Sequence, residues 1–490
     1  MKRVGNLYNK LYTRATMEEA YKGVMKDKKR KNDPTSLTFM MKHNKEYYIA
    51  EAARLLHDKR FKPRKPREAF RIDKGSGKVR HIQAPILYPD QLIHWALITV
   101  LKDIFMKGMD HWCCASIKDR GVLYAKNFLE KTLDNSNDDN NKVHVPVEKK
   151  YKYCLKMDIK KFFENIDRRC LIEKLERKIK DKDIIDLCRI IIYSAPGTNG
   201  DKNKGLPLGY YTSQWFANFY LQDFDHWLRE VAMPEYNVDI YIRYMDDMVI
   251  LGSNKRKLTK LMTDINNYIK PLGIWLKETS CIFDLKDRDI DFIGYRFNYG
   301  KTTLRKKILH NALKANRDLY KGKFTLKKLS SATAYNGWTS RSDTREFVNT
   351  HFQGNRDTEI EELKRLQRKA TESRLNSSEY LKLIEIEQDI INLRESRAAV
   401  EDNKLLIRYY DDGVRVVAST SFQFPDEEEY QEAHKPKPKE KKKKRRRKKN
   451  KPYHPTANII FDNNREKDEV IRDYNFEINQ LEELAARSKV

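Results

Sequence analysis

The sequence predicts an α+β fold, in which helices surround an antiparallel sheet and a helical and β C-terminal extension ends in a basic tail. Three observations lead to this class. Residues 238–252 form two apolar runs that meet at a tight turn, several other segments carry apolar residues at helical spacing, and the composition becomes rich in Glu, Lys and Arg after about residue 353. The 490 residues suffice for roughly two to four domains.

The elements of the N-terminal part follow from local patterns. Residues 1–60 have apolar positions at helix-like intervals, which predicts basic helices. FRIDKGSGKVRHIQAP, which begins at Phe70, alternates on both sides of a Gly-Ser-Gly turn and predicts a hairpin. Residues 89–105 indicate an apolar helix. The turn-forming segment 134–142 has no apolar residue, so we expect a loop there.

The central part alternates between strands and helices. Residues 153–159 read as a strand that ends near Asp158, and Asp167 is placed to cap a helix with a stripe of Leu171, Leu175 and Ile179. A second long helix is expected from Thr212. Its predicted core positions are Phe216, Phe219, Phe224, Trp227 and Val231.

The C-terminal part is predicted to hold a helical hairpin after residue 353, interrupted near 376–378, and then two strands between 405 and 424. Residues 435–451 carry thirteen Lys and Arg and one Glu, so +12 of the net +28 lies in this basic run. A last helix is expected over 468–486. The basic run is a solvated tail, a sequence-independent contact to the phosphates of a nucleic acid, or a nuclear localisation signal.

Composition excludes several classes of protein. Charged residues make up 35% and the mean hydropathy is -0.82, with no apolar segment long enough to span a membrane. No secretory signal is visible, so a cytoplasmic location is expected. The six cysteines lack metal-ligand spacing and are expected to be reduced thiols. The strong positive charge favours a polyanionic partner.

Three carboxylates are the candidate catalytic groups. Asp246 and Asp247 lie side by side at the predicted tip of the 238–252 hairpin, although such pairs also occur in ordinary turns. If the strand ending at Asp158 lies next to this hairpin in the sheet, all three carboxylates meet at one point. Hard oxygen ligands suit Mg²⁺, and two ions about 3.5–4 Å apart would support nucleotidyl transfer. Lys78 and Arg80 could clamp a triphosphate, or could simply form a solvated hairpin face.

Ordered sequence blocks resemble those of reverse transcriptases, within the group II intron-like bacterial and phage family. The blocks are KVRHIQAP at 78–85, the Asp158 segment with Phe162 and Phe163, GLPLGYYTSQ at 205–214, YMDD at 244–247, GIWLK at 273–277, FIGY at 292–295 and a thumb-like NGW at 336–338. The resemblance implies a right-hand polymerase with fingers, palm and thumb. The implied domains are 1–150 for the N-terminal helices and fingers, 151–300 for the palm, 301–352 for the thumb, 353–434 for the extension and 435–490 for the basic tail and terminal helix.

The resemblance also implies a role for each matched residue. Asp158, Asp246 and Asp247, with the backbone of Ile159, would bind two Mg²⁺ ions, for which Mn²⁺ could substitute, and Lys277 would donate a proton to pyrophosphate. The nucleotide would contact Lys78, Arg80, Phe162, Phe163 as the ribose gate, Leu208, Gly209 and Gln214. The primer and template would lie against Tyr244, Met245, Phe292, Gly294 and Tyr295.

Leu208 departs from the usual pocket block, which has glutamine at this position. The form with an apolar residue followed by Gly resembles the enzymes of diversity-generating retroelements, which copy a template RNA with errors at adenines and so diversify a target gene. This resemblance implies template RNA, cDNA and deoxynucleoside triphosphates as ligands. It also implies an accessory variability protein, a basic helical-bundle oligomer, and no membrane partner.

Two alternatives remain open at the level of sequence. One is an antiphage defence reverse transcriptase of the abortive-infection type, which shares the palm. The other is a non-catalytic nucleic-acid-binding protein that keeps the palm as a scaffold, although the presence of all three aspartates disfavours it.

Overall fold

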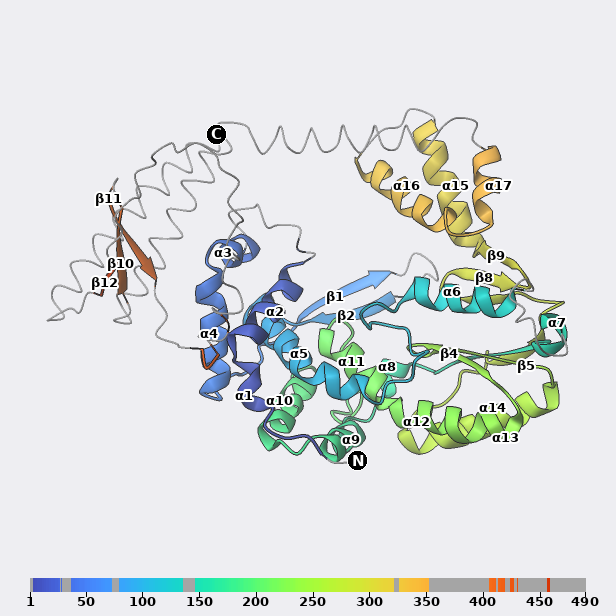
Figure 1. The fold of residues 1–490 in the computed structure, drawn as a ribbon, viewed down its shortest axis with the longest axis horizontal. Helices are drawn as coiled ribbons and strands as arrows, with labels where there is room; N and C mark the ends of the chain where they lie inside the picture. Colours follow the sequence, from blue (N-terminus) through green and yellow to red (C-terminus); the bar gives the residue numbers. More distant parts are fainter. Residues whose placement is uncertain are drawn as a thin grey trace, which may run out of the picture. The chain divides into compact units, whose positions relative to one another are not determined.

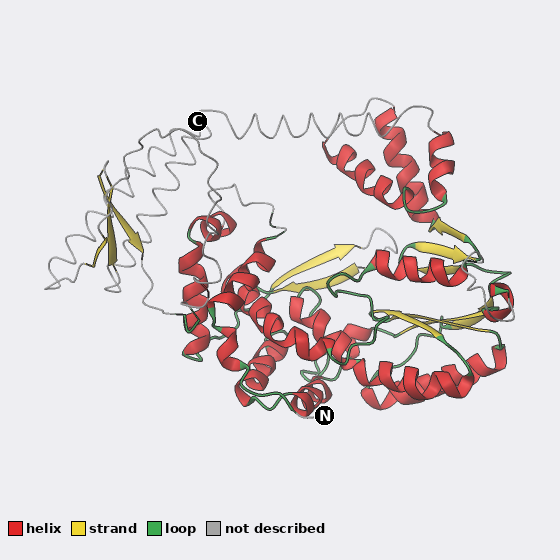
Figure 2. Ribbon diagram, in the orientation of Figure 1, coloured by secondary structure: helices red, strands yellow, loops and turns green. Residues whose placement is uncertain are grey.

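The computed structural model confirms a mixed α/β fold with antiparallel sheets (Figures 1 and 2). It describes residues 3–26, 28, 37–72, 79–134, 146–320, 326–351, 405–410, 413–418, 424–426, 430 and 456–458. The chain forms two compact units, which are described separately. The first comprises residues 1–5, 63–86 and 101–368, and the second comprises 6–62, 87–100 and 369–490. The expected boundaries at 150, 300, 352 and 434 stay predictions.

A four-stranded antiparallel sheet forms the centre of the first unit. Its order is β4-β5-β3-β6, with the bounds β3 Tyr153–Asp158, β4 Ile240–Tyr244, β5 Asp247–Gly252 and β6 Cys281–Asp284. The strands predicted at 153–159 and within 238–252 are therefore confirmed. Because side chains alternate along a strand, Leu155 and Met157 point to one face of β3, while Cys154, Lys156 and Asp158 point to the other.

Helices cover one face of this sheet, as Figure 1 shows for α12, α13 and α14. Helix α14 (Lys255–Ile269) begins at Asn254, whose side chain accepts from Lys257 N, and buries Leu258, Leu261, Ile265 and Ile269. The other helices of the first unit up to this point are α6 Val122–Leu133, α7 Val147–Lys150, α8 Phe162–Asn165, α9 Arg168–Lys178, α10 Lys182–Tyr193, α11 Tyr211–Tyr220, α12 Gln222–Trp227, η2 Leu228–Ala232 and α13 Met233–Tyr236, and η3 Lys270–Leu272 follows α14. Asp167 caps α9 as predicted, accepting from the N–H groups of Arg169 and Cys170.

The other face packs against α6 and a second sheet of order β7-β8-β9. These strands are β7 Ile290–Phe292, β8 Tyr295–Asn298 and β9 Lys301–Leu304. Leu129 of α6, Val249 and Leu251 of β5 and Phe297 of β8 belong to one buried cluster. The helices α15 Lys306–Tyr320, α16 Leu326–Thr339 and α17 Thr344–His351 follow β9. Asp158 and Asp247 thus lie on the sheet face that β7–β9 cover.

The strand-turn-strand predicted near residue 75 is an antiparallel hairpin of β1 (Arg67–Ile72) and β2 (Val79–Ala84). Gln83 N donates to Leu208 O at 2.8 Å, so β2 is held against the 205–214 segment. Gly209 has φ +120°, and a Cβ there would lie 2.6 Å from Gln83 O. Any larger residue at this position would push the hairpin away from the segment.

The second unit contains a helical layer. Its elements are α1 Tyr8–Leu11, α2 Arg14–Met25, α3 Leu37–His43, α4 Lys45–His57, the turn η1 Leu87–Gln91 and the start of α5 Leu92–Met106, which confirms the helices predicted for 1–60 and 89–105. Tyr8 Oη donates to Leu56 O at 2.8 Å, which fastens α1 to α4. Strands β10 Leu405–Tyr410 and β11 Gly413–Ala418 pair as predicted, and β12 Thr456–Asn458 joins them.

Asp426 anchors a C-terminal segment of the second unit to the start of α2. Its carboxylate accepts from Arg14 N and, at 2.9 Å, from Ala15 N. The Arg14 guanidinium lies over the rings of Phe424 and Tyr430. A carboxylate at the positive end of a helix satisfies amides that the helix leaves unpaired.

Asp426→Ala is expected to loosen the first turn of α2, at a cost of about 1–2 kcal/mol in local opening free energy. Amide hydrogen exchange at Arg14 and Ala15 should become faster. Asp181→Ala is the matched control, because Asp181 caps α10 by accepting from Ile184 N. It should speed exchange at α10 and leave α2 unchanged; unchanged exchange at α2 in Asp426→Ala would contradict the cap.

Two predictions about the long helix are wrong. The helix expected from Thr212 is broken at Leu221, where α11 ends and α12 begins. Val231, predicted to be core, has an exposed fraction of 54%, because Leu228 and Ala232 take the buried positions of η2.

Some predictions fall outside the described residues, namely the loop at 135–142, the helical hairpin after 353, the basic run 435–451 and the helix at 468–486. All six cysteines are free thiols, as expected. Among the described helices, none has the length and apolarity needed to cross a membrane.

Candidate active site

The strand register brings two of the predicted carboxylates together. In the β3–β5 pair, Asp158 lies directly opposite Asp247, and Lys156 lies opposite Val249. Asp246 occupies the adjoining turn, and its carbonyl accepts from Ile159 N at 3.1 Å. The three aspartates therefore share one end of the central sheet.

The turn that carries these carboxylates has an unusual backbone. Tyr244 of β4 pairs with Asp247 of β5, which leaves Met245 and Asp246 as a two-residue connection. Met245 has φ +58°, in the left-handed region that a side chain with a Cβ disfavours. Strained backbone of this kind persists where the surrounding structure fixes it.

Each of two aspartates faces a lysine. Asp158 Oδ1 lies 2.6 Å from Lys277 Nζ, and Asp247 Oδ1 forms an ion pair with Lys156. Burial lowers the pKa of Lys156 to about 8. Its ammonium also lies over the ring of Phe292, 5.3 Å from the centroid.

The surroundings of Asp246 disfavour the ionisation of its carboxyl group. Burial raises its pKa, and the nearby charge of Asp158 raises it further, while Lys277 and Arg80 act in the opposite direction. A partly buried carboxylate such as Asp246, with a second carboxylate close by, gains from an added cation.

The donor chemistry of this site fits a hard divalent cation. Oδ1 of Asp158 and Oδ1 of Asp247 are buried, and apart from the ion pairs with Lys277 and Lys156 neither has a hydrogen-bond partner within the described residues. Carboxylate oxygens in such a state are the ligands that Mg²⁺ prefers. In the parts of the chain that the structure describes, however, no group of three His, Cys, Asp or Glu side chains is already arranged to hold a metal ion.

The GIWLK segment runs beside the end of β3. Ile159 forms an antiparallel bridge with Leu276, Lys160 N donates to Trp275 O at 2.9 Å, and Lys277 N donates to Asp158 O at 2.8 Å. Both the backbone and the side chain of Lys277 therefore contact Asp158, while its role as a proton donor stays a prediction.

The structure describes most of the residues that are predicted to contact the nucleotide. Arg80 is exposed on β2 and close enough to influence Asp246, whereas Lys78 lies outside the described residues. Phe162 is buried, and the half-buried Phe163 meets it edge to face with 5.7 Å between centroids. Phe163 O accepts from Leu206 N at 2.7 Å, which links α8 to the 205–214 segment.

The remaining pocket residues differ in exposure. Leu208 is half-buried, and Gly209 is exposed and closely approached by β2. Gln214 is exposed on α11.

The FIGY segment joins the second sheet to the following helices. Phe292 and Tyr295 are buried, and Gly294 has φ +94°. A Cβ at Gly294 would lie 2.8 Å from the ring of Trp338, and the rings of Tyr295 and Trp338 are 5.0 Å apart. Glycine at 294 thus allows Trp338 of α16 to approach the turn between β7 and β8.

A pocket of about 260 Å³ lies between the carboxylates and the second sheet. Its lining includes Lys156, Asp158, Asp247, Ser280, Asp291 and Arg305. Sequence reasoning missed Lys156, although the alternation of β3 places it on the same face as Asp158. It also missed the Asp291–Arg305 ion pair, for which the sequence carries no signal.

Comparison with known proteins identifies the central region. Residues 72–297 match the family model described as reverse transcriptase (RNA-dependent DNA polymerase). The retron Ec73 reverse transcriptase of Escherichia coli is 26% identical over 209 residues, which cover 41% of this chain and 57% of that protein. The putative COX1/OXI3 intron 1 protein of Saccharomyces cerevisiae is 24% identical over 198 residues, covering 29% of this chain and 24% of that protein.

Among solved structures, apo telomerase from Candida tropicalis matches with a TM-score of 0.39 and 13% identity, over 61% of this chain and 57% of that chain. The curated matches span little more than half of the retron enzyme and a quarter of the intron protein. Residues 72–297 therefore form a reverse transcriptase domain, similar in sequence to a retron reverse transcriptase and to an intron protein.

Proposed function

We propose that this chain is an RNA-directed DNA polymerase. The observation that carries the proposal is the register of β3 and β5, which sets Asp158 opposite Asp247 with Asp246 in the adjoining turn. Three carboxylates at the end of a sheet, beside Lys277 and Arg80, suit a reaction in which a triphosphate is positioned and its charge neutralised. The reverse transcriptase match over 72–297 contains all of these residues.

The aspartates would hold two divalent cations, Mg²⁺ or Mn²⁺, with the help of the Ile159 carbonyl. Bound there, such cations lower the pKa of the primer 3′-hydroxyl and neutralise the leaving pyrophosphate. Lys156 and Lys277 form ion pairs with Asp247 and Asp158. During the reaction Lys277 would leave Asp158 and donate its Nζ proton to the pyrophosphate.

Other residues would position the reactants. Arg80 would contact the triphosphate, and Phe163 would pack against the sugar and exclude a 2′-hydroxyl. The primer end would lie in the pocket between the carboxylates and FIGY, with Tyr244 and Met245 beneath it. Lys78 and the basic run 435–451 would add phosphate contacts.

The finer proposal is that the enzyme belongs to a diversity-generating retroelement. Leu208 supports it, because a leucine beside the incoming nucleotide can pack against the base but cannot form a hydrogen bond to it. Loss of a polar contact weakens discrimination between correct and incorrect nucleotides. The chain would then act with template RNA and an accessory variability protein to make mutagenic cDNA.

Sequencing the cDNA made on the native template RNA tests this proposal. Errors concentrated opposite template adenines are expected. Faithful cDNA would remove the mutagenic role, and together with protection from phage it would favour the antiphage defence alternative. An absence of any DNA product would contradict the polymerase itself.

Leu208→Gln is expected to reduce misincorporation opposite adenine by about tenfold, because the amide restores a hydrogen bond that depends on the position of the nucleotide. The measurement is the error frequency per template adenine in sequenced cDNA. Leu123→Gln, the same substitution at an exposed position of α6, is the control and should leave the error frequency unchanged. Equal error frequencies in the two variants would show that residue 208 does not determine fidelity.

A further inference from the structure

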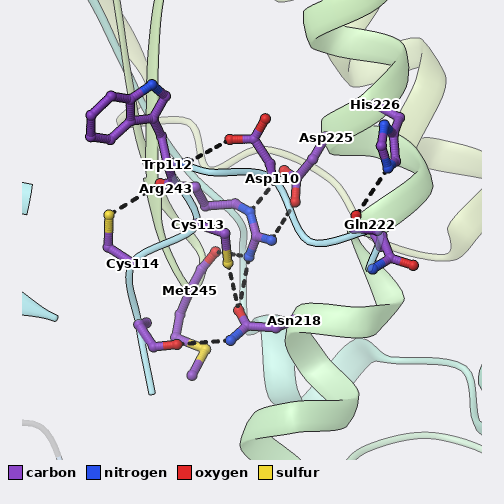
Figure 3. A network of polar contacts seen from close by, with 12 residues as sticks. Asp110, Trp112, Cys113, Cys114, Asn218, Gln222, Asp225, His226, Arg243 and Met245 are labelled. Atoms are coloured by element: carbon purple, nitrogen blue, oxygen red, sulfur yellow. Dashed lines mark hydrogen bonds and ion pairs between the residues drawn. The ribbon is translucent and has the colours of Figure 1, made fainter. Parts of the chain in front are cut away.

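A buried polar network contacts Met245 in the turn between β4 and β5 (Figure 3). Its centre is Arg243, the last residue but one of β4, whose side chain is fully buried together with that of Asp225 on α12. Arg243 Nε and Nη2 donate to the two carboxylate oxygens of Asp225 at 2.9 and 2.5 Å. Tyr241 Oη donates to the same carboxylate at 2.6 Å. Burial alone would lower the pKa of Arg243, but Asp225 raises it well above the ordinary value, so the guanidinium stays charged.

The third nitrogen of the guanidinium points away from Asp225 and toward the turn. Arg243 Nη1 donates to Asn218 Oδ1 and to Met245 O, both at 3.1 Å (Figure 3). Asn218 is itself fixed, because its Nδ2 donates to Ala115 O at 2.8 Å and its Oδ1 accepts from Cys113 Sγ. The direction of Nη1 is therefore set by residues from three separate segments of the chain.

The backbone of Arg243 is held as firmly as its side chain. Arg243 N donates to Trp112 O at 3.1 Å, and Arg243 O accepts from Cys114 N at 2.9 Å. The 112–114 segment thus runs along the free edge of β4. These two hydrogen bonds fix the backbone from which the Arg243 side chain extends.

The backbone conformation of Met245 depends on contacts of this kind. Its φ of +58° is unfavourable for a residue with a side chain, and its carbonyl direction determines where the next residue, Asp246, begins. A charged donor to that carbonyl favours this conformation over the extended alternatives. On the other side of the turn, Asp246 O is held by Ile159 N.

We propose that Arg243 is a positioning residue for the reaction. By donating to Met245 O, it holds the left-handed turn and so aims the carboxylates of Asp246 and Asp247, an inference that rests on the proposed polymerase function. Asp225 and Asn218 support this role by orienting the guanidinium. Apolar residues can replace a buried ion pair without loss of stability. Packing alone would therefore require neither the Arg243–Asp225 pair nor the hydrogen bond from Arg243 Nη1 to Met245 O.

Arg243→Lys tests the proposal, because lysine keeps the buried charge beside Asp225 but has no forked donor for Met245 O. The kcat for deoxynucleotide addition should fall about 100-fold, as expected for small misplacements of reacting groups. The KM for the nucleotide and the Kd for a primer-template duplex should change little. Tyr241→Phe is the matched control: it removes a hydrogen bond from the same buried carboxylate and leaves the contact from Arg243 to Met245 O, so its kcat should be close to that of the wild type.

A rescue experiment separates positioning from stability. Glycine adopts positive φ without steric cost, so adding Met245→Gly should make the turn less dependent on Arg243. In proteins that carry Met245→Gly, Arg243→Lys should therefore lower kcat by about tenfold or less. If Arg243→Lys does not fold, Asn218→Ala replaces it, because this change removes the group that aligns Nη1 and keeps the buried ion pair.

Three results would overturn the inference: a kcat for Arg243→Lys close to that of the wild type, an equal loss in Tyr241→Phe, or an undiminished loss in the Met245→Gly background. None of them affects the proposed function as long as the wild-type protein extends a primer. A wild-type protein that makes no DNA would instead contradict the proposed function.

Discussion

Replacing Asp246 and Asp247 together by asparagine is expected to reduce primer extension by at least about a thousandfold, which corresponds to about 4 kcal/mol of transition-state stabilisation. Asparagine preserves the shape of the turn but removes the negative charges that would hold the cations. Cations in such a site contribute several kcal/mol by stabilising the charge of the transition state. The measurement is the rate of Mg²⁺-dependent extension of a DNA primer on an RNA template.

Binding of the same primer-template duplex should survive the double substitution, because phosphate contacts from basic residues dominate affinity for nucleic acids. Asp239→Asn is the matched control. Asp239 lies just before β4 in the same hairpin and pairs with Lys150 at 3.4 Å, far along the sheet from the turn. Extension at the wild-type rate by the double variant would refute the carboxylate site.

The central sheet could be predicted because its strands are local patterns. Alternation of apolar residues over 153–159 and 238–252 identified β3, β4 and β5, and the carboxylates stood at their ends. Sequence alone left open whether the strand ending at Asp158 neighbours the hairpin. The structure supplies that pairing, with Asp158 opposite Asp247.

The burial of individual helical residues could not be predicted to the same extent. Helical spacing from Thr212 onward does not reveal that the helix breaks at Leu221. Nor does it reveal that Leu228 and Ala232, and not Val231, take the buried positions of η2. Tertiary packing decides which stripe of a helix is covered, and a single sequence contains no direct record of it.

The buried polar network around Arg243 could not be predicted for a different reason. Arg243 precedes YMDD in the sequence and reads as an ordinary strand residue. Its partners Asp225 and Asn218 lie on helices that precede the hairpin, and nothing local links them to it. The position of Lys156 could have been predicted, because side chains alternate along a strand and residues 156 and 158 of β3 therefore lie on the same face of the sheet. Pairwise contacts between distant polar groups are what a single sequence reveals least.

Replacing Phe163 by valine is expected to lower discrimination against ribonucleotides by about 100-fold, which is within the range that the removal of apolar bulk from a binding pocket produces. Phe163 follows β3 in α8, and its carbonyl is fixed by Leu206 N. Its ring is half-buried against Phe162, so the backbone should stay in place when the ring is shortened. A 2′-hydroxyl would then fit where the ring had excluded it.

The measurement is the ratio of kcat/KM for a deoxynucleotide to that for the matching ribonucleotide. Phe347→Val, at an exposed aromatic residue on α17, is the control for loss of an aromatic ring and should keep the wild-type ratio. The rate of deoxynucleotide addition should change little in Phe163→Val, because Asp158, Asp246 and Asp247 are untouched. A fall in both rates by the same factor would instead mean that Phe163 supports the fold of α8 and does not contact the sugar, since a gate acts on one substrate and leaves the other unaffected.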